Sequence, residues 1–422
     1  MNLLSRANEL LYAKTKKLAT KEFVAQQREI APIPVPFGDR MHVVTLTPFY
    51  PCAGDDAFGC FVAEPLPHLV PLRVETSVFA VQPFYRSASR VHATAPAARW
   101  CSFAAFPGPI GLASAGQFLF LRLLGTMRKL HRRSRIDLIH AHSALPCGHA
   151  AMLLARALNI PYVVTVHGLD AFSTRQVTGR AGERCLRVSD KIYRAASCVI
   201  CVSQHVCDQV LAGASGPINT TVVYNGADER LFSPSPTPDP RKDLSVLSVG
   251  DVIPSKGQEL VLRGVASLSA DFPGISYEVI GDGPHLLSLK KLAVELNMKS
   301  QVRFLGRCGR AQVAQALRRC AVFALPSTNE ALGCAYLEAM AAAKPVIGCR
   351  KQGIEEVIRS GVNGFLVDGT NVAELADILR RLLADPVLRE NVGRTARRTV
   401  LDRFTLAHQA ERLNQVYRSC LQ

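Results

Sequence analysis

The sequence contains no apolar run long enough to cross a membrane. A membrane-spanning helix needs about 18 or more uninterrupted apolar residues, and no segment of this chain of 422 residues provides them. The N-terminus also has no continuous apolar core of the kind found in a signal peptide. These absences predict a cytoplasmic protein, with peripheral attachment to the inner face of the plasma membrane as the alternative.

The sequence has few acidic residues relative to basic ones. The 34 Asp and Glu stand against 50 Lys and Arg, which gives a formal charge of +16. This excess attracts phosphate-bearing partners. The sequence has no zinc-finger spacing, no recognition helix and no basic surface interleaved with aromatic residues, so nucleic acid is disfavoured as the partner.

The cysteine pattern does not indicate disulfide bonds either. The 13 cysteines are odd in number and scattered, and many lie in apolar runs such as SCVICVSQ. Buried thiols in a reducing compartment fit this pattern. Cys198 and Cys201 form a CxxC, but within a run typical of a buried strand, which favours a structural role over a metal or redox role.

What the sequence has in abundance is short apolar runs that alternate with helical patterns. This rhythm predicts an α/β protein with parallel sheets, and the length indicates about two domains. We expect one Rossmann-like domain at 41–232, a proline-rich linker at 233–243 and a second Rossmann-like domain at 244–403. A terminal helix at 404–422 follows, and a basic helical extension at 1–40 precedes them. Leucines and lysines of this extension suit either an anionic membrane or loose packing against solvent.

The segment STNEALGCAYLEAM carries the most chemical information. It places Glu330 in a loop after an apolar strand and Glu338 inside the following helix. A loop carboxylate can accept hydrogen bonds from sugar hydroxyls, and one within the helix can bind a ribose diol. Gly333 allows a ligand to approach the backbone near the helix start. This segment resembles the Glu-x7-Glu signature of glycosyltransferase family 4, and ordered motifs extend the resemblance over roughly residues 41–420.

The resemblance implies the GT-B fold, in which two Rossmann-like parallel-sheet domains face a central cleft. It also implies a donor-diphosphate site at Lys256 and Gly257, where an ammonium beside a helix N-terminus neutralises the departing phosphate. Many family members have Arg where this chain has Asp251, and Asp251 is not a site residue. Arg307 in the FLGRCGR loop is the candidate for the missing second cation.

Three histidines lie in or directly after predicted strands of the first domain. His167 in VVTVHGLD matches the family histidine that points into the cleft and approaches the reacting sugar. His140 and His142 in IHAHS are structural candidates. We expect these two to face opposite sides of their strand, which argues against a shared metal ion.

Glycines complete the pattern that the resemblance implies for the donor site. Gly54 matches the first glycine-rich loop, although Asp55 follows it where the family often has a second glycine. Gly281 and Gly283 match the turn beside the nucleotide, and turn chemistry alone explains them equally well. Further along, Glu355 and Glu356 are predicted to lie at a helix start.

The resemblance therefore implies retaining transfer of a hexosyl group from a UDP- or GDP-sugar to a hydroxyl of a lipid-linked or saccharide acceptor. Bacterial surface-polysaccharide enzymes are the most similar members. His167, Lys256 and Glu330 are the candidate catalytic residues. No Asp-x-Asp pair occurs, so we expect neither a metal ion nor another cofactor. A GT-B-type sugar-nucleotide epimerase and a catalytically weak sugar-nucleotide-binding protein are the alternatives.

A basic cluster follows the apolar run GQFLFLRLL and comprises Arg128, Lys129, Arg132, Arg133 and Arg135. Cations at a helix C-terminus complement the helix dipole and need no partner. The same cluster could rest on an anionic membrane surface, and both interpretations stay open. The pattern says nothing about the oligomeric state.

Overall fold

The computed structural model describes residues 40–85, 98–168, 177, 179–235 and 244–422. Its first domain is built on seven strands and its second on six. The strands are β1 (Met41–Thr47), β2 (Val74–Pro83), β3 (Ala98–Phe103), β4 (Leu138–His142), β5 (Tyr162–Val166), β6 (Cys198–Cys201), β7 (Thr220–Val222), β8 (Ser245–Val249), β9 (Ser276–Ile280), β10 (Val302–Gly306), β11 (Val322–Ala324), β12 (Val346–Cys349) and β13 (Phe365–Val367). The helices are α2 (Cys60–Ala63), α3 (Leu66–Leu69), α4 (Pro109–Arg133), α5 (His149–Leu158), α7 (Gly179–Ala195), α8 (Gln204–Ala212), α9 (Gln258–Ser267), α10 (Leu286–Glu295), α11 (Arg310–Arg319), α12 (Cys334–Ala341), α13 (Val372–Ala384), α14 (Pro386–Arg403) and α15 (Leu406–Ser419).

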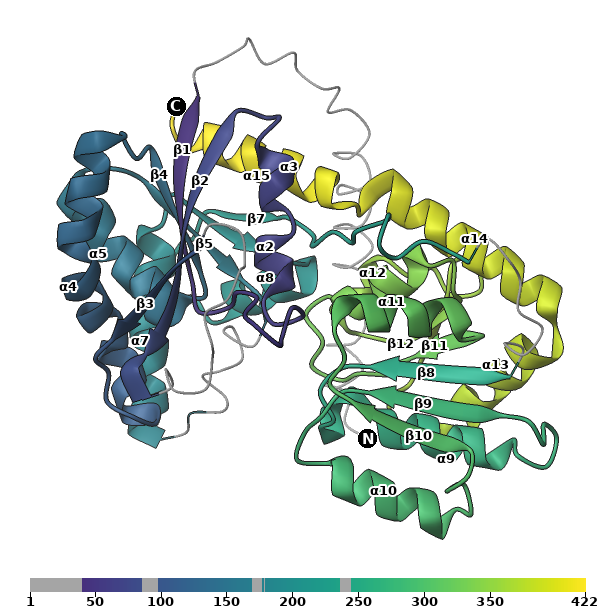
Figure 1. Ribbon diagram of the computed structural model, residues 1–422. Coiled ribbons are helices and arrows are strands. Elements are labelled where there is room, and N and C mark those ends of the chain that lie inside the picture. Colours follow the sequence, from purple (N-terminus) through teal and green to yellow (C-terminus); the bar gives the residue numbers. More distant parts are fainter. Residues whose placement is uncertain (1–39, 86–97, 169–176, 178, 236–243) are drawn as a thin grey trace, which may run out of the picture. The chain divides into compact units, whose positions relative to one another are not determined.

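Both sheets are parallel and reverse their strand order once (Figure 1). The first runs β3-β2-β1-β4-β5-β6-β7 and the second runs β10-β9-β8-β11-β12-β13. The chain therefore moves outward from β1 and from β8 in one direction and then returns to the other side of the same strand. In open parallel sheets, ligands bind beyond the strand ends at such a switch point. The switch points here lie between β1 and β4 and between β8 and β11.

Alternation along the strands divides the first sheet into two buried faces. Val44, Ile139 and Val164 belong to the core that includes α4 and α5, whereas Val43 and Leu138 pack with residues of α3 and α15. Side chains one residue apart on a strand point to opposite faces. Because both faces are covered, the strands read as continuous apolar runs in the sequence.

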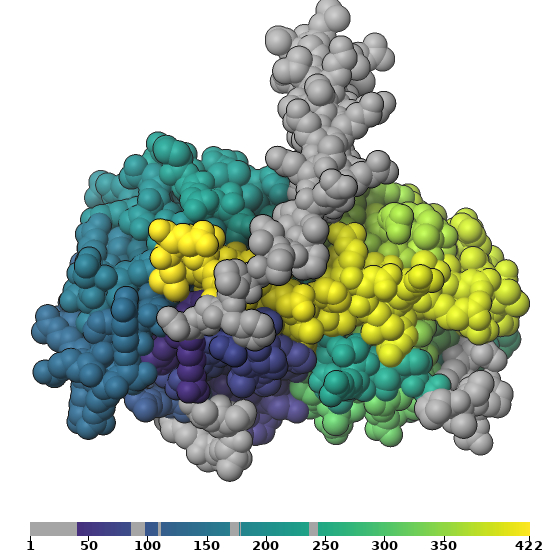
Figure 2. All heavy atoms as spheres, turned by 90° about the horizontal axis from the view of Figure 1, so that it is seen from above, coloured from purple at the N-terminus to yellow at the C-terminus, as the bar shows by residue number. Residues whose placement is uncertain are grey.

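The C-terminal helix crosses back to the first sheet. Thr405 caps its start by accepting a hydrogen bond from the His408 N–H at 3.3 Å. Ala410, Leu413 and Tyr417 then pack on the α3 face of the first sheet. The predicted terminal helix is confirmed, and its packing partner is now defined. The C-terminal segment forms a yellow band on the surface in Figure 2.

The predicted α/β fold with two Rossmann-like parallel-sheet domains is confirmed. The predicted extension lies outside the described residues apart from Arg40, as does most of the predicted linker, so the domain boundaries stay predictions. All thirteen cysteines are free thiols. Within the described part of the chain, no helix combines the length and apolar character required to span a membrane.

Candidate functional site

The switch point of the second sheet carries a lysine–glutamate pair. Lys256 ends a short 3-10 turn, Pro254–Lys256, in the connection after β8, and Glu330 lies in the loop after β11. The Lys256 Nζ donates to Glu330 Oε2 at 2.6 Å, and the two side chains are 24% and 10% exposed. Since β8 and β11 are neighbours, their carboxyl ends bring together two residues that are far apart in the sequence. The structure thus joins two of the three candidate catalytic residues.

The loop that carries Glu330 is held by backbone contacts. The Glu330 N–H donates to Gln352 Oε1 at 2.9 Å, and the Gly353 N–H donates to the Glu330 carbonyl at 3.1 Å. Asn329, just before it, has a φ of 63°, a left-handed conformation that an Asn tolerates better than most residues. These contacts orient the carboxylate toward Lys256.

Glu338 lies in α12, as the sequence predicts, but its carboxylate is already paired with an arginine side chain. Its Oε1 accepts a short hydrogen bond from Arg310 Nη1, and only 5% of Glu338 is exposed. Arg310 also makes two hydrogen bonds to the Glu64 carboxylate, of 2.9 and 2.7 Å. Sequence reasoning missed both Arg310 and Glu64. The second arginine of the FLGRCGR motif was the available signal for Arg310.

Arg307 lies between two aspartates. Its Nη1 is 3.4 Å from Asp55 Oδ2, and its Nη2 is 3.6 Å from Asp251 Oδ1. The side chain is 62% exposed. The residue that replaces the usual arginine is therefore an ion-pair partner of the candidate second cation. A diphosphate that bound Arg307 would have to compete with two carboxylates, so the role of Arg307 stays a prediction.

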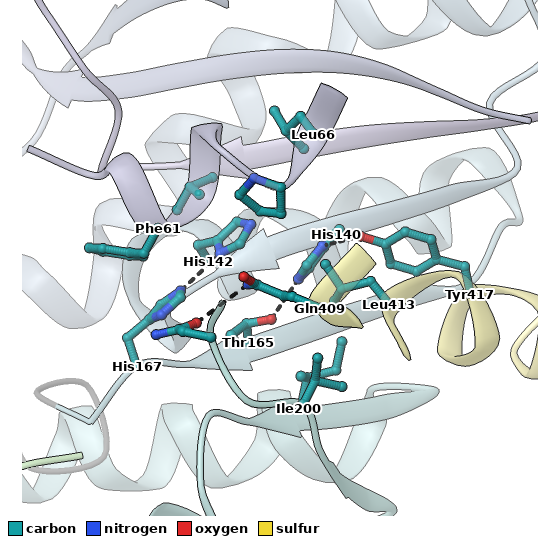
Figure 3. A pocket seen from close by; sticks show the side chains of 14 residues that line it. Phe61, Leu66, His140, His142, Thr165, His167, Ile200, Gln409, Leu413 and Tyr417 are labelled. Carbon is teal, nitrogen blue, oxygen red and sulfur yellow. Dashed lines mark hydrogen bonds between the residues drawn. The ribbon is translucent and has the colours of Figure 1, made fainter. Parts of the chain in front are cut away.

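His167 and His142 form a directly bonded imidazole pair (Figure 3). His142 Nδ1 lies 2.8 Å from His167 Nε2, and the two rings are nearly parallel, with centroids 5.1 Å apart. His140 continues the cluster, because its ring centroid is 4.3 Å from that of His142. Its nitrogens contact Tyr417 Oη at 2.7 Å and Thr165 Oγ1 at 2.6 Å. All three rings line one small cavity of about 20 Å³, which is room for about one water molecule.

The expectation that His140 and His142 face opposite sides of their strand was wrong. Residues two apart on a strand share a face, because the side-chain period is two. His140 and His142 therefore lie on the same face as Leu138, beneath α15. Among the described residues, no group of three or more His, Cys, Asp or Glu side chains is arranged to hold a metal ion.

Burial keeps these imidazoles neutral. It lowers the pKa of His140 and of His167 to about 3, and it lowers that of His142 well below its ordinary value. Neighbouring imidazoles lower the pKa of His140 and of His142 further. With both rings neutral, a single proton lies between His142 and His167. His167 also packs its ring on Phe61 at 4.7 Å, so its orientation is fixed from two sides.

The predicted site glycines fall into two groups. Gly257, Gly281 and Gly283 each lie against another backbone segment, and a Cβ on Gly257 would come within 2.4 Å of the Pro326 carbonyl oxygen. Close backbone packing therefore requires a glycine at position 257. Gly54 has open space around the place of a Cβ, and Gly333 immediately precedes α12 with the Tyr336 ring against it.

Glu355 and Glu356 lie in the first turn of a short 3-10 helix, Gly353–Glu356. Glu356 also reaches the start of α8 in the first domain, where it accepts hydrogen bonds from the Gln204 and His205 N–H groups at 2.8 and 2.7 Å. The prediction that both glutamates lie at a helix start is confirmed, and Glu356 in addition caps the start of a second helix. The physical reason for the role, a carboxylate that stabilises a helix N-terminus, still applies to Glu356.

Two Rossmann-like domains with charged side chains at the switch point of the second sheet have the architecture of the GT-B glycosyltransferases. The family description "Glycosyltransferase Family 4" matches residues 62–231, and "Glycosyl transferases group 1" matches residues 230–399. An uncharacterized glycosyltransferase of Methanocaldococcus jannaschii is 31% identical over 61% of this chain and 68% of its own length. The chain belongs to glycosyltransferase family 4.

Other relatives agree with this assignment, and solved structures share the fold. D-inositol 3-phosphate glycosyltransferase 1 of Catenulispora acidiphila is 29% identical over 71% of this chain and 77% of its own length. Sucrose-phosphate synthase from Thermosynechococcus elongatus, at 22% identity, has the same fold with a TM-score of 0.72 over 90% of this chain and 99% of that one. Anabaena HepE, solved with UDP-glucose, is 22% identical with a TM-score of 0.67 over 90% and 100% of the two chains.

Proposed function

We propose that this protein transfers a hexosyl group from a UDP- or GDP-sugar to a hydroxyl acceptor, with retention of anomeric configuration. The acceptor is a saccharide or a lipid-linked saccharide of polysaccharide or glycolipid assembly. The observation that carries the proposal is the contact of 2.6 Å between Lys256 and Glu330 at the switch point of the second sheet. At this position the Lys256 ammonium is suited to bind the diphosphate of the donor, and the Glu330 carboxylate is suited to bind the hydroxyl groups of its sugar.

Each side chain then has a distinct chemical task. When the C1–O bond of the donor breaks, its electron pair leaves with the diphosphate, and Lys256 is suited to neutralise that added charge. Glu330, freed from the lysine by the phosphate, accepts hydrogen bonds from sugar hydroxyls. Glu338 binds the ribose, and His167 contacts the reacting sugar on the acceptor side. Domain closure around the donor would exclude water that could hydrolyse it.

The names of similar proteins support this substrate class. The Anabaena protein was solved with UDP, with UDP and glucose, and with UDP-glucose. Several curated relatives are D-inositol 3-phosphate glycosyltransferases, and one from Bacillus anthracis is an N-acetyl-alpha-D-glucosaminyl L-malate synthase. The acceptors named for these relatives differ, so membership of the family does not identify the acceptor of this protein.

The decisive experiment is a transfer assay. The protein is first screened with UDP- and GDP-sugars by thermal shift, because a ligand that binds the folded state raises the melting temperature. The donor so found is then incubated with candidate saccharide and polyprenyl-linked acceptors. Anomeric configuration of the product is read by NMR. Lys256→Met and Glu330→Gln test the assigned roles, and Arg380→Met, which removes an exposed arginine paired with Asp271 at 3.1 Å, is the control.

We expect the Lys256 variant to lose about 10²- to 10³-fold in kcat, as is typical when one stabilising charge is removed from a transition state. The control should retain wild-type transfer. An isomerised donor in the absence of acceptor would favour the epimerase alternative. Wild-type transfer by both Lys256→Met and Glu330→Gln would disprove the catalytic assignment.

We propose in addition that the reaction needs no metal ion, because the sequence has no Asp-x-Asp clamp. Lys256, backbone dipoles and Arg307 would then stabilise the departing diphosphate without a divalent ion. Transfer should therefore survive dialysis against EDTA. Loss of activity that added Mg²⁺ or Mn²⁺ restores would refute this part of the proposal.

The basic end of α4 supports a cytoplasmic protein that attaches to the inner face of the plasma membrane. Its cluster, Arg128, Lys129, Arg132 and Arg133, is exposed, and Arg135 follows with its side chain 85% exposed. Each such charge contributes about 1 kcal/mol near an anionic surface. Sedimentation with vesicles that contain acidic lipid should pull down the protein, whereas equal binding to neutral vesicles would eliminate the electrostatic attachment.

A further inference from the structure

Arg310 joins charged side chains of the two domains. It is the first residue of α11, and only 9% of it is exposed. Its guanidinium contacts the carboxylates of Glu64 and Glu338. The face of the guanidinium packs on the Phe232 ring, with Cζ 4.7 Å from the centroid. Its backbone N–H also donates to both Asp56 oxygens, at 3.0 and 3.2 Å.

These contacts fix the direction of the guanidinium. The Glu64 carboxylate receives Nε and Nη2 together, a bidentate geometry that sets the plane of the fork. Asp56 holds the start of α11, and the Phe232 ring supports one face of the guanidinium. Nη1 is then directed at Glu338, and it has little freedom to turn elsewhere. The first domain supplies Asp56 and Glu64, whereas Glu338 belongs to α12 of the second domain.

Charge explains why this arrangement matters for Glu338. A carboxylate that is 5% exposed would be costly to keep ionised without a partner. Arg310 provides that partner and contacts only one oxygen, Oε1. Burial acts to lower the pKa of Arg310, but the negative charges around it, that of Glu338 first among them, outweigh burial and raise the pKa. Glu338 is thereby held in one orientation with Oε2 left to bind a hydroxyl group.

We propose that Arg310 is a positioning residue that aims the Glu338 carboxylate at the donor ribose, and that Glu64 of the first domain sets Arg310 for this task. The inference rests on the proposed function, because it assumes that Glu338 binds the ribose. It adds that ribose recognition by the second domain depends on a carboxylate supplied by the first. Domain closure and ribose recognition are then coupled through one guanidinium.

The test compares a nucleotide with its deoxy counterparts. UDP and GDP are measured by calorimetry, and the tighter of the two is compared with its 2′-deoxy and 3′-deoxy forms. A hydrogen bond from a ribose hydroxyl to a carboxylate should favour the ribonucleotide about tenfold or more. Glu338→Gln should reduce this preference strongly and serves as the reference variant.

The decisive variants are Arg310→Lys, Arg310→Met and Glu64→Gln. We expect each variant to lower the preference for the ribonucleotide. Arg310→Met should lower it nearly as far as Glu338→Gln does. Glu64→Gln should lower it by about threefold. Arg380→Met, which removes an exposed arginine of the same domain, should leave the preference unchanged. Circular dichroism and melting curves establish that each variant is folded, and Glu64→Gln keeps the test available if Arg310→Met does not fold.

The outcomes separate the two proposals. A merely structural role of Arg310 would weaken binding of the ribo- and deoxyribonucleotides by the same factor, and this result would overturn the inference. An unchanged preference in folded Arg310→Met and Glu64→Gln would do so as well. If the wild type itself shows no preference, or Glu338→Gln retains it, the ribose role in the proposed function fails first.

Discussion

The buried histidine cluster should make the first domain unusually sensitive to mild acid. His140 and His142 are 2% and 6% exposed, and His167 is more than half buried beside them. In the unfolded chain each has an ordinary pKa of about 6.5. In the folded protein the pKa of His140 and of His167 is about 3, and that of His142 is also well below its ordinary value. Below pH 6.5 the unfolded state therefore binds more protons, and stability falls as the pH falls.

The magnitude follows from the two pKa values. Between pH 7.5 and pH 5.0, each histidine that charges only in the unfolded state costs about 2 kcal/mol of folding free energy. The two histidines whose pKa is about 3 together cost roughly 4 kcal/mol, and His142 acts in the same direction, against a typical total stability of about 5–15 kcal/mol. Burial raises the pKa of Glu64 and of Glu356, so these groups act in the opposite direction as the pH falls toward their ordinary values. Because Glu64 and Glu356 are present in the wild type and in every variant, their contribution cancels when the pH dependence of a variant is compared with that of the wild type.

The assay is urea unfolding followed by the fluorescence of Trp100, the one tryptophan of the chain, which lies in β3 of the first sheet. This probe reports the first domain even if the two domains unfold separately. His140→Asn retains a hydrogen-bonding side chain without a titrating group, so the stability lost between pH 7.5 and 5.0 should shrink by about 2 kcal/mol.

The control is Leu123→Ala, which creates a cavity on the opposite face of the first sheet and should cost about 2–5 kcal/mol at every pH. Leu123 of α4 is buried in the core that includes α4 and α5 and does not line the histidine cavity, so this variant should keep the wild-type pH dependence. The reasoning would be refuted if the wild type lost less than about 1 kcal/mol over this range. Identical pH dependence in His140→Asn and the wild type would refute it too.

Two further predictions concern stability. Glu356→Gln removes the carboxylate at the start of α8 and should destabilise the protein by about 1–3 kcal/mol in thermal or urea unfolding, and an unchanged midpoint would contradict it. Gly257→Ala should lower stability more than Gly306→Ala. Both glycines have positive φ, of 73° and 66°, but only Gly257 has a backbone atom within 2.4 Å of the added Cβ. Equal melting temperatures of the two variants would contradict the packing argument.

Local patterning in the sequence determined most of the elements. The apolar runs MHVVTLT and SVLSV are strands, and the spacing of Leu406, Ala410 and Leu413 predicted the terminal helix. Glu330 and Glu338 could be assigned to a loop and a helix because the strand and helix patterns flank them directly. The family resemblance then indicated the two-domain fold, which the structure confirms. The strand period of two also places His140 and His142 on one face of β4, as the structure shows.

Other features depend on residues that are far apart along the chain. Lys256 meets Glu330 across a separation of 74 residues because the second sheet places β11 beside β8. Arg310 reaches Glu64 across 246 residues, and Glu356 reaches α8 across about 150. No local period encodes such pairs. Strand order and helix docking are set by the burial of apolar faces over the whole chain, so only the tertiary structure decided which charges meet.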